Sequence, residues 1–100
     1  MITLPNGYTM QTTFFEDFSI ADEFGEEAIR DTWKNAFQAW KHNHVYLTEL
    51  AIVMSNESCW WWDKNKEISI LYAELYRKTD AYCMEKLKGA ELAFYINATD

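Results

Sequence analysis

The strongest constraint on the fold of this chain is the spacing of its residues between about Glu67 and Lys88. A mainly apolar stripe recurs there at every third or fourth position, comprising Ile68, Leu71, Tyr72, Leu75, Thr79, Tyr82, Cys83 and Leu87. An α-helix has about 3.6 residues per turn, so this spacing places the stripe on one face of a helix. The pattern predicts an amphipathic helix that buries this face in a core.

The same periodicity predicts two further long helices upstream. One runs from about Glu26 to Lys41, and its apolar face carries Ile29, Trp33, Phe37 and Trp40. The other runs from about Val45 to Lys64, and its face carries Leu47, Leu50, Ala51, Met54, Ser58 and Trp61. Short polar joints at residues 42–44 and 63–66 separate the three helices, and connections this short favour antiparallel neighbours.

Two shorter helices are expected at the ends of this bundle. Thr13-Phe14-Phe15-Glu16 matches the capping box, which predicts a helix from there to about Phe24. Gly25 can adopt the left-handed conformation that ends such a helix. A last short helix is expected over about residues 90–96, after Gly89. With only three Gly and one Pro in the chain, turn-rich β architectures are disfavoured.

The N-terminal residues predict a small β element. Apolar and polar residues alternate around Asn6-Gly7, a pair that suits the positive φ angles of a tight hairpin turn. We therefore expect a short hairpin within residues 1–11, with Ile2, Leu4, Tyr8 and Met10 against the helices; the alternative is a loose arm. The predicted fold is mainly α, a single domain over residues 1–100. It is a compact bundle of about four to five helices with a short N-terminal β-hairpin.

The negative charge of the chain is concentrated in one segment. The net charge is −7, which argues against direct binding to nucleic acid, where phosphate contacts need Lys and Arg. Between Thr13 and Asp31, Arg30 is the single base among seven acids, namely Glu16, Asp17, Asp22, Glu23, Glu26, Glu27 and Asp31. Such a segment is either a solvated surface or a recognition face for a basic protein surface, whose binding would be salt-sensitive.

Three successive tryptophans, Trp60-Trp61-Trp62, stand out next. On a helix they spread over about 200°, which is wider than one buried face. Trp61 aligns with the apolar stripe and is predicted to lie in the core, so at least one of Trp60 and Trp62 is peripheral. Exposed Trp is enriched at protein interfaces. The alternative is a wide, aromatic-rich core that takes in all three rings.

No motif predicts catalysis, a metal or a cofactor. His42 and His44, even with Glu49, fall short of the four ligands of structural zinc and lack the usual spacing. Cys83 lies on an apolar stripe, where thiols are usually inert packing, and Cys59 lies beside the tryptophans. Glu26 and Glu27 are adjacent and point about 100° apart on a helix, so they form no acid–base pair. We therefore expect a non-enzymatic protein without metal or cofactor.

Targeting signals are also lacking in the sequence. No stretch approaches the roughly 18 consecutive apolar residues of a membrane span. Residues 1–10 lack the positive and apolar regions of a signal peptide. We expect a cytoplasmic protein with no membrane contact and with reduced cysteines.

Several segments carry a resemblance to known proteins. They are Thr12 to Asp22, Asp31-Thr32-Trp33, Ala36-Phe37, Trp40-Lys41, Tyr46 to Leu50, Leu87-Lys88-Gly89 and Ala98-Thr99-Asp100. Through these segments, residues 12–100 resemble small uncharacterised proteins encoded by bacteriophages, prophages and integrative elements of Firmicutes. The resemblance implies a mobile-element origin and action inside a bacterial host cell. It assigns no role to any residue.

Genes of this size in such elements often encode inhibitors of host machinery or of defence systems, including anti-CRISPR proteins, which is an association by size and neighbourhood. Together with the acidic segment, this predicts a protein-binding module directed at a host or phage protein with a basic surface. Its expected contact residues are the seven acids above with Trp60 and Trp62. The alternative is a structural phage protein that self-associates through these two tryptophans.

Overall fold

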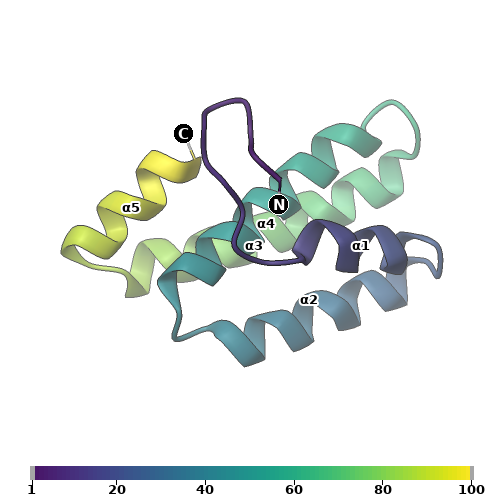
Figure 1. Cartoon of the computed structure of the whole chain (residues 1–100). Coiled ribbons are helices and arrows are strands. Elements are labelled where there is room, and N and C mark those ends of the chain that lie inside the picture. Colours follow the sequence, from purple (N-terminus) through teal and green to yellow (C-terminus); the bar gives the residue numbers. More distant parts are fainter. Residues whose placement is uncertain (1, 100) are drawn as a thin grey trace.

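A computed structural model describes residues 2–99 as five packed α-helices (Figure 1). The helices are α1 (Phe14–Asp22), α2 (Glu26–Trp40), α3 (His44–Trp61), α4 (Lys66–Lys86) and α5 (Gly89–Thr99). The predicted mainly helical fold is confirmed, and every helix expected from the periodicity is present. The observed ends lie within about three residues of the expected ones, as is usual for frayed helix termini.

Helix α3 is the centre of the bundle. It packs most extensively against α4 and also contacts α1, α2 and α5 (Figure 1). All eight side chains from Leu47 to Met54 are buried, including the polar Thr48 and Glu49. A helix surrounded by neighbours on every side buries more than one stripe. The apolar stripe predicted for this segment is therefore a minimum, and residues between its members are buried as well.

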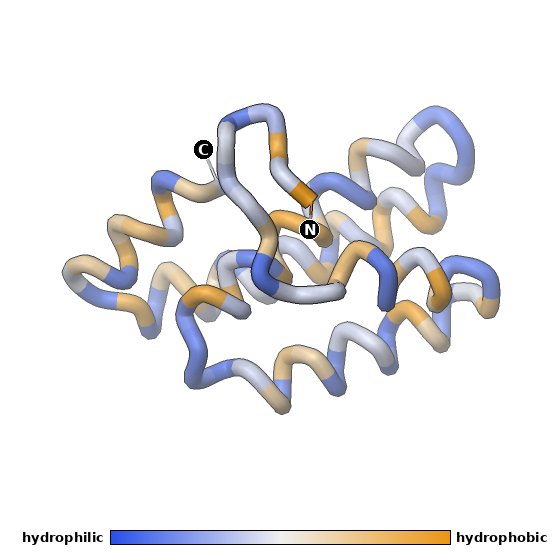
Figure 2. The backbone as a smooth tube through the Cα atoms, in the orientation of Figure 1, coloured by the Kyte–Doolittle hydropathy of each residue, from blue (hydrophilic) through white to orange (hydrophobic). Residues whose placement is uncertain are grey.

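The core is continued by one face of each surrounding helix. Helix α1 contributes Phe14, Phe18 and Ala21, and α4 contributes Leu71, Tyr72 and Leu75. A smaller cluster under α5 joins Leu47, Ala51, Cys83, Leu87 and Tyr95. In Figure 2 the polar α2–α3 and α3–α4 connections are blue, while orange segments recur along α3 and α4. The aromatic face of α2 is less deeply buried, since Ile29 is fully covered but Trp40 is 42% exposed.

The predicted N-terminal β-hairpin is wrong. Within residues 2–99 the structure has no β-strand, and Thr3 and Thr9 form one isolated antiparallel bridge. The turn spans Leu4 to Gly7, where the Gly7 N–H donates to the Leu4 carbonyl over 2.9 Å. Of the four apolar side chains expected to pack on the helices, Met10 is buried, Leu4 and Tyr8 are half-buried and Ile2 is 43% exposed.

Pro5 explains why the turn is displaced from Asn6-Gly7. A two-residue turn there would pair Pro5 with Tyr8, but proline has no backbone N–H to donate. Such a turn also needs a positive φ at Asn6, whereas the positive φ angles among the described residues belong to glycines. Pro5 at the second turn position instead presets the turn at residues 4–7, and Gly7 follows with a φ of 91°.

The helix starts depend on asparagine more than on the predicted capping box. The side chains of Asn43 and Asn65 accept hydrogen bonds from the third residues beyond them, at 3.0 and 3.3 Å, and so cap α3 and α4. Thr13 precedes α1 but makes no capping hydrogen bond, so the predicted capping box is wrong. Its hydroxyl lies 3.4 Å from Asp17 instead. Gly25, expected to end α1, instead directly precedes α2 as its N-cap with a φ of 101°, and α1 is capped at Glu23.

Candidate functional site

The acidic segment predicted from the sequence lies on α1, the turn after it and the first half of α2. Six of its carboxylates belong to exposed residues, and we call them the acidic surface: Glu16, Asp17, Glu23, Glu26, Glu27 and Asp31. They are exposed because α1 buries its other face, through Phe14 and Phe18. Four of the six lie in the first turns of α1 and α2, where negative charge is favourable beside a helix N-terminus.

Arg30, the one base in this segment, is directed elsewhere. Its guanidinium donates to Glu74 on α4 over 2.7 Å, and both side chains are about half exposed. The same contact holds the pKa of the Glu74 carboxyl below its usual range. The acidic surface is thus left without its single internal counter-charge.

Two large apolar side chains are exposed beside these carboxylates. Ile20 on α1 is 60% exposed, and Phe24 in the α1–α2 turn is 75% exposed. Glu16, Ile20 and Phe24 follow one another at intervals of four residues, so they lie along one side of α1 and its C-terminal turn. A purely solvating surface gains nothing from such side chains, whereas an interface does.

Asp22 differs from the other six predicted acids. It is half-buried, and its carboxylate accepts a hydrogen bond from the Tyr72 hydroxyl of α4. It also meets Glu57 of α3, and burial together with the hydrogen bond to Asp22 raises the pKa of Glu57 to about 8. A proton is therefore held between two carboxyl groups near neutral pH. The pair ties α1 to α3 and α4, so we leave Asp22 out of the acidic surface.

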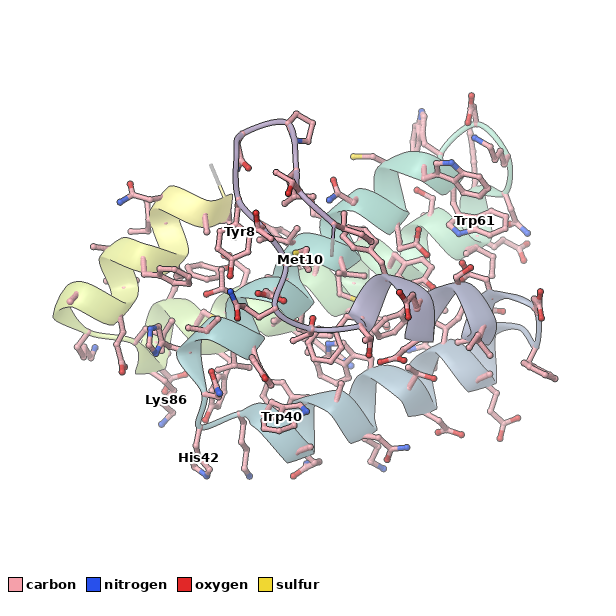
Figure 3. The ribbon with its side chains drawn as sticks, in the orientation of Figure 1. Tyr8, Met10, Trp40, His42, Trp61 and Lys86 are labelled. Carbon is pink, nitrogen blue, oxygen red and sulfur yellow. The ribbon has the colours of Figure 1, made fainter. Side chains whose placement is uncertain are left out.

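Trp60 and Trp62 both lie outside the core, at 54% and 58% exposed. Trp61 packs against the main cluster, as predicted, and Figure 3 shows it at the end of the molecule opposite His42 and Lys86. Its indole N–H is buried without a hydrogen-bond partner among the described residues. The two exposed rings are each covered by a lysine: the Lys64 ammonium lies 4.1 Å from the Trp60 ring centre and that of Lys66 lies 5.1 Å from Trp62.

The two histidines do not meet Glu49. His42 is exposed, and the His44 Nδ1 lies 3.4 Å from a carboxylate oxygen of Glu91 on α5. Across residues 2–99, no three His, Cys, Asp or Glu side chains gather where they could hold a metal ion. The two cysteines are separate as well, since Cys59 is exposed and Cys83 is buried. Burial, and to a lesser extent Asp80, raises the pKa of the Cys83 thiol to about 12.

Glu49 has an internal role that the sequence did not suggest. Its carboxylate is fully buried and accepts hydrogen bonds from the Tyr8 hydroxyl, the Gln11 N–H and both the N–H and hydroxyl of Thr12, at 2.7 to 2.8 Å. Burial and the contact with Glu49 raise the pKa of Tyr8. One signal existed: Glu49 is the single ionisable residue in the apolar run from Leu47 to Met54. Its partners lie 37 or more residues away, so no local pattern identifies them.

None of the helices within residues 2–99 combines the length and the apolar character needed to cross a bilayer. No family model, curated protein or solved structure shows significant similarity to this chain.

Proposed function

We propose that this chain is a non-enzymatic protein-binding module whose acidic surface binds a protein with a basic surface. The observation that carries the proposal is the combination of six exposed carboxylates on α1, the turn after it and α2 with two apolar side chains exposed on α1 and the turn. Carboxylates alone would account for solubility. Ile20 and Phe24 add the apolar area that a protein interface buries at its centre.

The charges support rapid and selective association. Net charges of opposite sign on two surfaces steer the partners together and disfavour acidic competitors. The orientation of Arg30 toward Glu74 leaves the field of the acidic surface uncompensated nearby. Binding through such a surface is expected to weaken as salt rises, because exposed pairs are screened over about 8 Å at physiological ionic strength.

The resemblance to phage and integrative-element proteins suggests where the partner is found. It supports a site of action in the bacterial cytoplasm and a partner among host or defence proteins, including CRISPR effectors. Proteins that bind nucleic acid carry basic surfaces for phosphate, and exposed carboxylates could occupy those surfaces in place of phosphate. This reasoning concerns the class of partner and assigns no catalytic or cofactor role to the chain.

The test is a charge reversal on the acidic surface. We expect Glu23→Lys, Glu26→Lys and Glu27→Lys in one variant to weaken capture of the partner by more than about tenfold, since each lost charge pair contributes to both attraction and rate. Capture is measured from bacterial lysate and then with purified defence effectors, at low and at physiological salt. The matched control reverses Asp63, Glu67 and Glu85, three exposed acids that lie outside the acidic segment.

Glu67 makes this control strict, because it lies in the first turn of α4 as Glu26 and Glu27 do in α2. The stability cost of reversing a first-turn acid is therefore present in both variants. If the two variants bound the partner equally well, or if binding did not respond to salt, the acidic surface would not be the binding surface.

The exposure of Trp60 and Trp62 favours a second candidate function, self-association through these rings. The expected sign is a concentration-dependent rise in sedimentation coefficient that Trp60→Ser with Trp62→Ser abolishes. A wild-type chain that stays monomeric at high concentration would exclude this candidate.

A further inference from the structure

A groove between α2 and α4 has no role in the function proposed above. Its floor is apolar, formed by Trp33 and Phe37 of α2 with Leu75 of α4, and its volume is about 390 Å³. Its edges are formed by Lys34 of α2 and Lys78 of α4, with Arg30 at one end, where it is paired with Glu74. We call this feature the α2–α4 groove.

A second, separate hollow lies toward the far ends of the same two helices. Tyr82 of α4 packs edge-on against Phe37, with ring centres 4.9 Å apart, and marks the transition. Beyond it lies this second hollow, of about 360 Å³, whose lining includes Lys41, His42 and Lys86 and one acid, Glu91, which lies 3.4 Å from His44. Figure 3 shows His42 and Lys86 together at this end of the molecule, near Trp40.

This region carries much of the positive charge of an acidic protein. Five of the nine Lys and Arg residues of the chain line the two hollows, namely Arg30, Lys34, Lys41, Lys78 and Lys86. Within the described part of the chain, Lys34, Lys41 and Lys78 have no carboxylate oxygen within 4.0 Å. The net charge of −7 therefore conceals a local basic surface.

The floor of the groove is ordered by internal contacts. Trp33 stacks on Phe37 with ring centres 5.0 Å apart and an interplanar angle of 22°. The Trp33 indole N–H donates to the Thr79 hydroxyl over 2.9 Å, which fixes the ring against α4. A preformed apolar floor between basic edges suits an amphipathic helix that has acidic edges, because apolar stripe and charges are then matched together.

Such a helix exists in this chain. The exposed side of α1 presents Ile20 and then Phe24 one turn later, flanked by Glu16, Asp17 and Glu23. We infer that α1 of a second copy of this chain docks in the α2–α4 groove, with Ile20 and Phe24 against the aromatic floor. Its carboxylates then face Lys34 on one edge and Lys78 on the other.

The two surfaces share no residue, so one copy can offer both. The contact joins unlike surfaces. Made twice about a two-fold axis it gives a reciprocal, isologous dimer, and made once between successive copies it is heterologous and gives a ring or a longer chain. The inference rests on the proposed function in one respect, since it takes the acidic surface to be a binding surface and names a second copy as one partner. A foreign basic protein would then compete with self-association.

A charge-swap experiment tests this contact by sedimentation in about 0.15 M salt, where the Debye length of about 8 Å screens repulsion between whole molecules. One variant carries Lys34→Glu with Lys78→Glu, and the other carries Glu16→Lys with Glu23→Lys. We expect each variant alone to self-associate at least about tenfold more weakly than wild type. We expect the equimolar mixture to regain wild-type association, because both contacts are again between opposite charges.

Net charge alone cannot explain this pattern, because the variant with the smaller net charge is also expected to associate more weakly than wild type. Each pair of reversals changes the net charge of −7 by four, so the two variants carry −11 and −3 and still repel each other overall. The matched control for the groove is Lys64→Glu with Lys66→Glu, which reaches the same net charge beside Trp60 and Trp62. This control and Trp60→Ser with Trp62→Ser should associate as wild type does.

Each remaining outcome overturns the inference. A monomeric wild-type chain, a mixture that stays monomeric, or equal weakening by the Lys64 and Lys66 control would each exclude the groove as the docking site. Failure of the proposed function is distinguishable, because the Lys34 and Lys78 variant keeps the whole acidic surface. If that variant captures the foreign partner but does not self-associate in the mixture, the proposed function stands and this inference falls.

Discussion

Glu49 and Glu57 lie about two turns apart on α3, and their carboxyl groups meet opposite surroundings. Glu49 is fully buried among hydrogen-bond donors from the N-terminal segment. Glu57 is half-buried and meets a second carboxyl group, that of Asp22. The first site surrounds the carboxylate with hydrogen-bond donors, and the second raises the pKa of Glu57 to about 8.

The difference shows that the neighbouring groups, more than the depth of burial, determine whether a buried acid anchors a distant segment or has its pKa raised. At Glu49 the donors Tyr8, Gln11 and Thr12 attach residues 2–12 to the central helix, although no strand forms in this segment. At Glu57 the shared proton links α1 to α3. One site should therefore fix the chain, and the other should make its packing depend on pH.

The largest effect is expected from Glu49→Ala. It leaves several donors buried without an acceptor and detaches the N-terminal segment, so we expect a loss of about 3–5 kcal/mol in the free energy of unfolding. Denaturant unfolding measures the loss, and amide hydrogen exchange should show the N–H groups of Gln11 and Thr12 losing protection. Glu67→Ala, at an exposed site on α4, is the control. A loss below about 1 kcal/mol would mean that Glu49 does not hold the segment.

Tyr8→Phe should have an intermediate effect at the same site. It removes one hydroxyl, which donates to the Glu49 carboxylate over 2.7 Å, and leaves the remaining donors in place. A hydrogen bond to a charged group contributes about 1.5–3 kcal/mol, and we expect a loss in that range by thermal or denaturant unfolding. Tyr46→Phe removes a hydroxyl that has no hydrogen-bond partner within residues 2–99, so equal losses in the two variants would contradict the prediction.

Glu57→Gln tests the pH-dependent side of the comparison. In the unfolded chain Glu57 releases its proton near its ordinary pKa of 4.5, whereas in the folded chain it keeps the proton until about pH 8. The folded state binds more protons across this window, so wild-type stability should fall as pH rises from about 4.5 to 8 and then level off. Glutamine donates to Asp22 without titrating.

We therefore expect Glu57→Gln to match wild type near pH 5 and to exceed it by about 1–2 kcal/mol above pH 8, since solvent screens part of the interaction at this half-buried site. The measurement is the midpoint of thermal unfolding as a function of pH. Glu67→Gln should leave the wild-type pH dependence unchanged. Parallel curves for Glu57→Gln and wild type would show that the pair holds no shared proton.

The helices could be predicted because their information is local. A repeat of three to four residues specifies a buried face wherever it occurs, and it predicted the three long helices α2, α3 and α4 with small errors at the ends. The short helices α1 and α5 were expected from the residues near their starts, Thr13 to Glu16 and Gly89. The hairpin prediction was wrong because it rested on the pair Asn6-Gly7 alone. Pro5, one residue earlier, lacks the N–H that the expected pairing needs and shifts the turn.

The carboxyl sites could not be predicted in the same way, because their partners are distant in the sequence. Asp22 and Glu57 are 35 residues apart and meet through the packing of α1 on α3. The acidic segment could be predicted from the sequence because its charged residues lie close together along the chain. That segment nevertheless included Asp22, whose half-buried position depends on the contact with Tyr72.

The α2–α4 groove shows the limit of arguments from net charge. Its basic residues extend from Arg30 to Lys86 and form no run in the sequence. They come together because α2 packs beside α4, with Phe37 against Tyr82. The sequence located the acidic segment, but the basic groove becomes visible only when the packing places α2 beside α4.

The smallest effect is expected at the exposed acids, which neither anchor a segment as Glu49 does nor contact a second carboxyl group as Glu57 does. Glu23→Gln with Asp31→Asn should change the free energy of unfolding by less than about 0.5 kcal/mol, because both residues are exposed and make no recorded ion pair within the described chain. At low salt the change should be slightly stabilising, since it relieves repulsion, and it should vanish as salt screens the charges. Thermal unfolding at two salt concentrations measures both effects. A loss above about 1 kcal/mol would mean that these acids stabilise the fold, so their position on the surface would need no partner to explain it.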